Sequence, residues 1–250
     1  MNSVQKEQSK SETDVALVIP VYNEEENVVE HLQYHLEEFN WSEVVVVDGG
    51  STDGTVEKVQ SFGEGVNLLT TEIASRGRQL RKGVNHTTSS WVVMLHVDTT
   101  IPCSFALTRI TDRAPTWGWF DCQLDDSSFP YQMISRAISW RSFLLSNPTG
   151  DQVLWSHRSL LNEVGGVPDV PIMEDVALVG KLRALQSGQR IKTPVVTSAR
   201  KWKREGAFRV ILLMWMFRCA YTTGVSPSTI YKWYYGRTPP GQSGEINQGG

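Results

Sequence analysis

Two polar side chains follow an apolar run in the stretch MLHVDTTIP, residues 94–102, and their chemistry suits a bound metal ion. The run ends in His96 and Asp98, and residues two apart on a strand point to the same side. Carboxylate oxygens suit Mg²⁺ and Mn²⁺, whereas imidazole is a poorer ligand for Mg²⁺. Two readings of this stretch stay open at this point: a metal site short of one carboxylate, with Asp98 as the ligand, or only a strand that runs into a turn. For His96 three roles stay open: a ribose or other pocket contact, a metal ligand, or a buried structural histidine.

Residues of this kind are positioned by the ends of strands, and the sequence predicts several strands. Apolar runs predict strands at residues 15–21, 44–47, 66–70 and 91–96, separated by helices at about 24–38, 54–62 and 76–84. Asn23 precedes three glutamates and is expected to cap the first helix. Strands that alternate with helices predict an open, mostly parallel α/β sheet with helices on both faces. Ligands of such sheets bind outside the carboxyl ends of the strands.

The pattern changes after residue 102. A strand is predicted over residues 117–124, and helices over 131–145 and about 174–186. Residues 148–155 and 165–175 are expected to be loops or strand edges. We expect this half of the chain to receive a second substrate.

The composition argues against several classes of protein. A net charge of −3 lacks the basic excess of a nucleic-acid binder. The odd number of cysteines, far apart in the sequence, argues against a disulfide framework and a structural zinc site. The first residues have no apolar core of a secretory signal. We therefore expect a cytoplasmic protein that binds no nucleic acid.

Four spaced motifs resemble glycosyltransferase family 2, whose members have the GT-A fold and use nucleotide-sugars: VIPVYNEEENV, VVVVDGGSTDGT, SRGRQLRKGVN and MLHVDTTIP. The stretches PTGDQVLW, GGVPDVPIMEDVAL and TSARKWKREG extend the resemblance over about residues 14–235. They are most similar to a bacterial subgroup associated with selenium-domain or radical-SAM genes and with arsenosugar biosynthesis. The resemblance implies a Rossmann-like GT-A domain with a nucleotide-sugar-binding half, 14–102, and an acceptor half, 103–235. Disordered segments, 1–13 and 236–250, are expected to flank it.

The resemblance also implies which residues hold the donor. The first motif would line the nucleotide pocket, the second would meet the base, and the basic helix at residues 76–84 would lie near the diphosphate. Residues 200–204 resemble the basic-aromatic segment that closes over the diphosphate, although their spacing departs from QxxRW. The expected donor-side residues are Pro20, Tyr22, Glu24, Asp48, Gly49, Arg78, His96, Arg200, Trp202 and Arg204.

The catalytic and acceptor residues are implied in the same way. Asp98 matches the last acid of the family's DxD motif, whose first acid is replaced here by histidine. Asp175, in the first turn of a predicted helix, would be the general base, with Glu174 beside it. The acceptor side would be shaped by Gly150, Asp151 and Gln152.

These roles describe an inverting glycosyltransferase of the hexosyltransferase type that uses Mn²⁺ or Mg²⁺. The donor would be a UDP-, GDP- or dTDP-sugar, and the acceptor a hydroxyl of a small or lipid-linked molecule. The departing diphosphate needs neutralising charge, and the attacking hydroxyl needs a carboxylate to take its proton. Two alternatives stay open: a nucleotidyltransferase, which would need a basic glycine-rich loop in place of YNEEEN, and a non-catalytic sugar-nucleotide-binding protein.

Residues 207–221 form the most apolar part of the chain. The uninterrupted apolar run, residues 210–217, is shorter than the roughly 20 residues that cross a bilayer. Because a helix that is apolar nearly all round is usually buried, we expect it to pack against the domain. The alternative is peripheral contact with the inner face of a membrane, with Arg209 and Arg218 reaching toward the interface.

Overall fold

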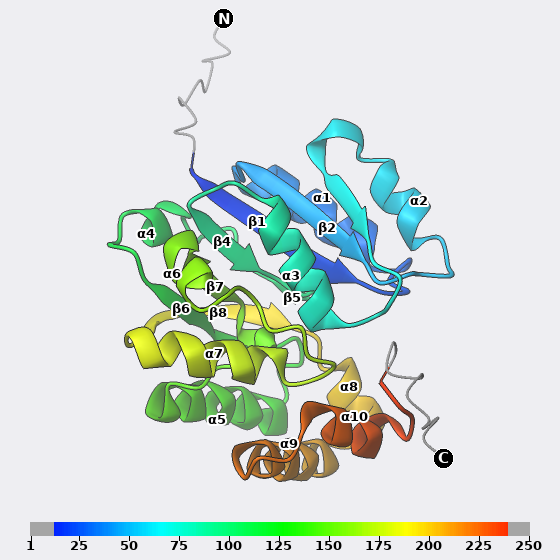
Figure 1. Ribbon diagram of the computed structural model, residues 1–250, viewed down its shortest axis with the longest axis vertical. Coiled ribbons are helices and arrows are strands. Elements are labelled where there is room, and N and C mark those ends of the chain that lie inside the picture. The colour runs from blue at the N-terminus through cyan, green and yellow to red at the C-terminus, as the bar shows by residue number, and fades with distance from the viewer. Residues whose placement is uncertain (1–12, 240–250) are drawn as a thin grey trace, which may run out of the picture.

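The computed structural model describes residues 13–239, which form a curled open sheet covered by helices (Figure 1). The strands are β1 (Val15–Val21), β2 (Glu43–Asp48), β3 (Asn67–Thr70), β4 (Trp91–Met94), β5 (Thr99–Thr100), β6 (Trp117–Leu124), β7 (Leu154–His157) and β8 (Gln189–Thr197). Their order is β3-β2-β1-β4-β7-β6-β8-β5. The pairs β1–β2, β1–β4, β2–β3 and β6–β8 are parallel, which confirms a mostly parallel α/β sheet.

Helices cover both faces of the sheet, as predicted. They are α1 (Val28–Glu38), α2 (Thr55–Gln60), α3 (Arg76–His86), α4 (Thr108–Thr111), α5 (Phe129–Leu145), α6 (Arg158–Glu163), α7 (Glu174–Leu185), α8 (Arg200–Glu205), α9 (Ala207–Thr222) and α10 (Pro227–Tyr235), with short 3-10 helices η1 (Gly63–Gly65) and η2 (Gly150–Gln152). Successive side chains of a strand point to opposite faces. Leu17 accordingly packs in the core that contains Leu32 of α1, and Val18 in the core that contains Leu80 of α3.

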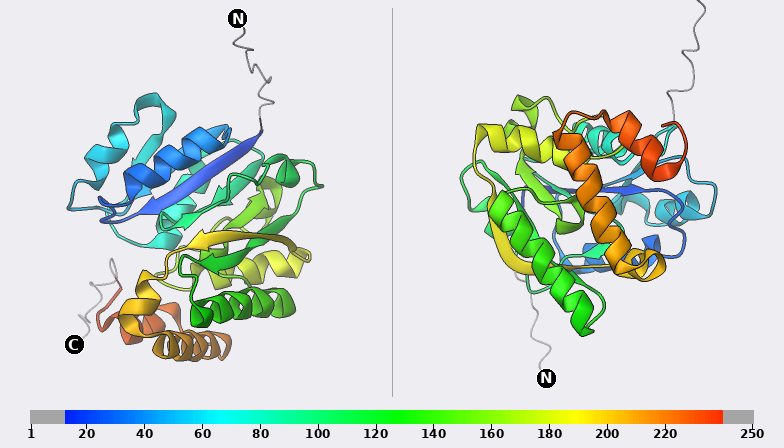
Figure 2. Two further views of the ribbon diagram at one scale, coloured as in Figure 1. Left: turned by 180° about the vertical axis from the view of Figure 1, so that it is seen from behind. Right: turned by 90° about the horizontal axis from the view of Figure 1, so that it is seen from below.

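The carboxyl-terminal helices form a further layer beyond the end of β6. Trp202 of α8 and Val210 of α9 pack with Leu124 of β6, and Ile134 and Ile138 of α5 lie against this small core. Seen from below, α5 and α9 run across the same side of the molecule, with α10 beside α9 (Figure 2).

Two predicted boundaries are wrong near the site. The first helix begins at Val28 rather than near residue 24, because Asn23 has a left-handed backbone (φ 53°). Its side-chain oxygen accepts a hydrogen bond from Thr52 N–H at 2.9 Å, so it joins two loops instead of capping a helix. β4 ends at Met94, and Thr99 N–H donates to His96 O at 3.1 Å, which closes a turn over residues 96–99. His96 and Asp98 therefore lie in a turn and not on a strand.

Several elements of the second half were not predicted. β8 contains Pro194 and alternates buried with exposed residues, so it lacks the apolar run of a central strand. It pairs with β6 across an irregularity at Phe120/Asp121. The helices α6 and α10 were also missed. Apart from residues 13 and 236–239, the predicted disordered segments lie outside the described residues.

Residues 207–221 lie in α9, which packs against the domain as expected but only on one side. In α9 only Val210 and Phe217 are buried, while Phe208 is 81% exposed. Within residues 13–239, no helix combines the length and the apolar character needed to cross a bilayer.

Candidate functional site

A cleft of about 570 Å³ opens outside the carboxyl ends of β1 and β4. The strand order reverses between these two neighbours, and such a switch point is where open α/β sheets bind ligands. Both halves of the chain contribute to the walls. The predicted residues that line the cleft are Pro20, Tyr22, Glu24, His96, Asp98, Asp151, Asp175 and Trp202.

The loop after β1 is fixed by the loop after β2. Asn23 N–H donates to Ser51 Oγ at 2.9 Å, and Glu24 N–H donates to Thr55 Oγ1 at 2.8 Å. Asn27 Nδ2 donates to the carboxylate of Glu24 at 2.9 Å, while partial burial raises the pKa of that carboxyl. The two motifs that resemble the donor-binding signature therefore form one structural unit at the cleft.

Asp48 and Gly49 lie behind this wall rather than on it. Asp48 is buried, and its carboxylate accepts hydrogen bonds from Gly50 N–H at 2.8 Å and Ser51 N–H at 3.0 Å. A Cβ on Gly49 would lie 3.0 Å from the Cα of Ala74, so close packing between loops explains this glycine. Neither residue is among those that line the cleft.

The basic helix α3 offers a different arginine from the one predicted. Arg78 Nε pairs with Asp169 at 3.2 Å and does not line the cleft. Arg76 does, and its Nε lies 3.0 Å from Glu174 Oε1. Gln79 was also missed: its amide donates to Val21 O at 2.7 Å and Val47 O at 2.8 Å, which ties together the ends of β1 and β2.

The two acids at the start of α7, Glu174 and Asp175, lie in different environments. Glu174 is buried, and burial raises its pKa although Arg76 opposes the shift. The charge of Glu174 in turn raises the pKa of Arg76. Asp175 is half-buried and lines the cleft; its Oδ2 accepts from Gly150 N–H at 2.9 Å and its Oδ1 from Val176 N–H at 2.7 Å. Glu174 is thus held by an ion pair, and Asp175 presents its remaining lone pairs to the cleft.

His96 belongs to the same cluster as Asp175. Its imidazole packs on Gly150, where a Cβ would come within 2.6 Å of Cε1. Its Nδ1 lies 3.4 Å from Asp151 Oδ1. Burial raises the pKa of Asp151, but the hydrogen bond and charge of His96, with Arg76 and Lys201, outweigh it and lower that pKa to about 2. The structure therefore makes His96 a cleft contact that faces Asp151.

Gln152 points away from this cluster. It is fully buried, its amide donates to Phe120 O at 3.1 Å, and its side-chain oxygen accepts from Ser142 Oγ. This residue ties α5 to β6 and does not line the cleft. Of the three predicted acceptor-side residues, only Asp151 brings a side chain to the cleft.

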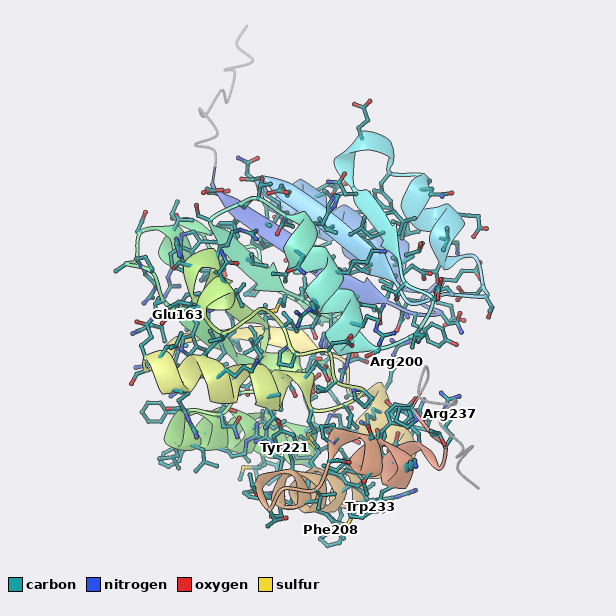
Figure 3. All side chains as sticks on the ribbon, in the orientation of Figure 1. Glu163, Arg200, Phe208, Tyr221, Trp233 and Arg237 are labelled. Atoms are coloured by element: carbon teal, nitrogen blue, oxygen red, sulfur yellow. The ribbon has the colours of Figure 1, made fainter. Side chains whose placement is uncertain are left out.

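The basic-aromatic segment of α8 lies opposite the loop after β1. Arg200, Lys201 and Arg204 line a second recess with Glu24 and Asp98, and Lys201 also lines the cleft. The two spaces therefore share residues, and positive side chains border both. Arg200 and Arg237 lie on the same side of the molecule (Figure 3).

Sequence reasoning missed the wall made by α9 and α10, because no motif marks it. This wall is aromatic and cationic. Arg218 makes no ion pair among the described residues, and its Nη2 is buried without a partner. Burial lowers the pKa of Arg218, and burial with the neighbouring Arg218 lowers that of Arg141 to about 10. The cleft residues of this wall are Met214, Phe217, Arg218, Tyr231, Tyr234 and Tyr235.

Asp98 is the residue best suited to a divalent metal. Its side chain is exposed and borders the cleft and the recess. No group of three His, Cys, Asp or Glu side chains within residues 13–239 can enclose a metal by itself. Mg²⁺ in phosphate sites commonly binds through one or two carboxylates and the substrate phosphates. A single exposed carboxylate fits that arrangement, whereas the imidazole of His96 is turned toward Asp151.

The sheet order and the cleft at its switch point define a GT-A-type α/β fold. Residues 16–114, less than half of the chain, match the model of the family Glycosyl transferase family 2. The chain is also similar to the glycosyltransferase AglJ of Haloferax volcanii, at 31% identity over 99 residues, 39% of this chain. The chain spans about a third (31%) of the length of that relative.

The similarity to solved structures extends over more of the chain than the sequence matches do. TarS 1–349 of S. aureus has a TM-score of 0.58 and 18% identity, covering 74% of this chain and 60% of its own. The mannosyltransferase PcManGT of Pyrobaculum calidifontis was solved with GDP-Man and Mn²⁺. It has a TM-score of 0.56 and 23% identity, and the match covers 91% of this chain and 66% of PcManGT. Glucosyl-3-phosphoglycerate synthase of Mycobacterium tuberculosis has a TM-score of 0.56 and 16% identity, and the match covers 82% of this chain and 78% of the synthase.

Proposed function

We propose that this protein transfers a sugar from a nucleotide-diphosphate-sugar to a hydroxyl acceptor with inversion at the anomeric carbon. One observation carries the proposal: the acids Asp98 and Asp175 line one cleft together with the cations Arg76 and Lys201. The family match of residues 16–114 supports the reaction class. TarS was also solved with UDP-GlcNAc, and PcManGT with GDP-Man and Mn²⁺; by likeness we extend a nucleotide-sugar and a divalent metal to this chain.

In the proposed reaction Asp175 is the general base. The acceptor oxygen attacks the anomeric carbon and its proton passes to a free lone pair of the Asp175 carboxylate. The bond from the anomeric carbon to the diphosphate oxygen breaks, and its electron pair leaves with the diphosphate. Arg76 and Lys201 stabilise that charge. When bound at Asp98, Mn²⁺ or Mg²⁺ supplies further positive charge against the leaving group.

The remaining donor-side residues have supporting roles in this proposal. Pro20, Tyr22 and Glu24 border the nucleotide, and Arg200 and Arg204 approach the phosphates from the recess. Arg78, Asp48 and Gly49 shape the loops around the site without contacting the donor. The arsenosugar-associated subgroup stays a prediction.

Asp175→Asn tests the proposal without knowledge of the acceptor. Calorimetry with a panel of nucleotide-sugars identifies the donor, and slow hydrolysis of that donor uses water as the acceptor. We expect Asp175→Asn to bind the donor as the wild type does and to lose turnover by roughly 10²–10⁴-fold. Undiminished turnover would remove Asp175 as the base. Release of pyrophosphate from a nucleoside triphosphate would instead establish the nucleotidyltransferase alternative.

A further inference from the structure

Three helices at one side of the molecule present an exposed apolar face. We define the outer layer as α5, α9 and α10, which lie farthest from β1–β3 (Figure 1). Thirteen of the seventeen exposed large apolar side chains among residues 13–239 lie on these helices, which concentrates them far beyond ordinary scatter. They are Phe129, Met133, Trp140, Phe143, Leu144 and Leu145 on α5, Phe208, Ile211, Leu212, Trp215 and Met216 on α9, and Trp233 and Tyr235 on α10.

The exposed face is continuous with a small core beneath it. Met214 and Val210 of α9 belong to the cluster that also contains Ile134 and Ile138 of α5, so the inner sides of both helices are occupied. Their outer sides carry the exposed apolar side chains, and one of these, Phe143, has the guanidinium of Arg190 4.9 Å from its ring centroid. Phe208 and Trp233 lie at the lower edge of the molecule, where α9 and α10 end the fold (Figure 3).

The charge of the outer layer differs from that of the whole chain. The chain has a net charge of −3, yet none of the three helices contains an Asp or Glu. They contain five basic residues: Arg136, Arg141, Arg209, Arg218 and Lys232. An apolar face edged by cations complements a bilayer surface that carries anionic lipids.

A second copy of the chain is a poorer occupant of this face. In a two-fold dimer the same patch meets itself, so Arg136, Arg209 and Lys232 would face the same cations without any acid of the layer to pair with. Like charges brought together across an interface oppose association. Anionic lipid head groups remove this penalty, because they supply the missing negative charge.

We infer that the outer layer is a peripheral docking surface for anionic lipid membranes. The aromatic and aliphatic side chains enter the boundary between head groups and acyl chains, and the exposed cations Arg136, Arg209 and Lys232 contact the lipid phosphates. Because α9 and α10 also line the cleft with Arg218, Tyr231 and Tyr234, docking holds the cleft about one helix diameter, roughly 10 Å, from the lipid.

Flotation of the full chain with vesicles tests this inference and requires no enzymatic activity. We expect binding to vesicles of phosphatidylcholine with phosphatidylglycerol, weaker binding to phosphatidylcholine alone, and release by high salt. Leu212→Gln with Trp215→Gln should weaken binding about tenfold or more, and Arg209→Gln about fivefold. Circular dichroism of each variant checks that the fold is retained.

Matched substitutions outside the outer layer serve as controls. Leu185→Gln removes an exposed leucine of α7, and Lys192→Gln removes an exposed cation of β8; neither should change flotation. The inference is overturned if the wild type does not float with anionic vesicles, or if Leu185→Gln weakens binding as much as the α9 variant. It is also overturned if light scattering shows a dimer that the Leu212→Gln, Trp215→Gln variant dissociates.

Discussion

The backbone N–H of Gly150 donates a hydrogen bond to Oδ2 of Asp175 over 2.9 Å, across 25 positions of sequence. This contact joins the start of η2 to the first turn of α7. The imidazole of His96 packs on the same glycine, so the turn after β4 is part of the arrangement. The proposed base is therefore positioned by two segments that lie far from it in the chain.

Gly150→Ala should disturb this arrangement while the fold is retained. The added Cβ would lie 2.6 Å from His96 Cε1, so the ring or η2 must move and shift Asp175. We expect donor hydrolysis to fall about 10- to 100-fold, as for other small misplacements of a catalytic group. Gly180→Ala is the control, because a Cβ there meets no atom within 4 Å. Wild-type turnover in Gly150→Ala would show that the contact does not position the base.

The ion pair of Arg76 and Glu174 should matter more for stability than that of Arg78 and Asp169. Arg76→Met leaves the buried carboxyl of Glu174 without its partner. Because Arg76 is half exposed, we expect Arg76→Met to lower the free energy of unfolding by about 2 kcal/mol, which is below the range for fully buried pairs. Arg78→Met breaks an exposed pair and should lower the free energy of unfolding by less than about 1 kcal/mol.

Urea unfolding of the two arginine variants measures this difference. Adding Glu174→Gln to Arg76→Met should recover part of the loss, because a neutral amide is less costly to bury than an unpaired carboxylate. Equal destabilisation by Arg76→Met and Arg78→Met would contradict the distinction between the pairs.

Acid should destabilise the fold through His35. Its Nδ1 donates to His31 O at 2.9 Å, and its Nε2 accepts from Ile101 N–H at 3.4 Å, so the buried ring is neutral. Burial lowers the pKa of His35 to about 4, and burial also lowers that of His31 well below its ordinary value. Between pH 6.5 and 4 the unfolded chain therefore binds more protons than the folded one, and the free energy of unfolding falls as the pH falls.

We expect the free energy of unfolding to drop by about 2 kcal/mol or more between pH 7 and pH 5. Denaturant titrations at both pH values provide the measurement. His35→Gln should reduce this dependence, whereas His86→Gln, at an exposed position of α3, should leave it unchanged. A stability that does not vary between the two pH values would refute a buried neutral His35.

Removal of metal should weaken donor binding through Asp98. We expect the wild type to bind its nucleotide-sugar at least about tenfold less tightly in EDTA than in Mn²⁺. A tenfold loss of affinity corresponds to the loss of one charge-assisted contact. Asp98→Asn should bind the donor equally in both conditions. His96→Ala should keep the dependence on metal, because His96 Nδ1 faces Asp151. A changed preference between Mn²⁺ and Mg²⁺ in His96→Ala would make this histidine a metal ligand.

The sequence by itself determined the sheet of the first half and the place of the site. Apolar runs and helical periodicity are local signals, so β1 to β4 and their helices were predicted in order. Because parallel strands end at one edge, residues after β1 and β4 had to meet there. Tyr22, Glu24 and Asp98 accordingly line one cleft, and Asp175 lies in the first turn of its predicted helix.

Only the tertiary structure decided which way several polar side chains point. Asp48 turns to the amides of its own loop, Gln152 to the core and Arg78 to Asp169. These choices depend on partners brought close by folding, which sequence spacing does not encode. The same reason explains α9: its composition is apolar nearly all round, and only the position of α5 and α10 decides which side is buried and which is exposed.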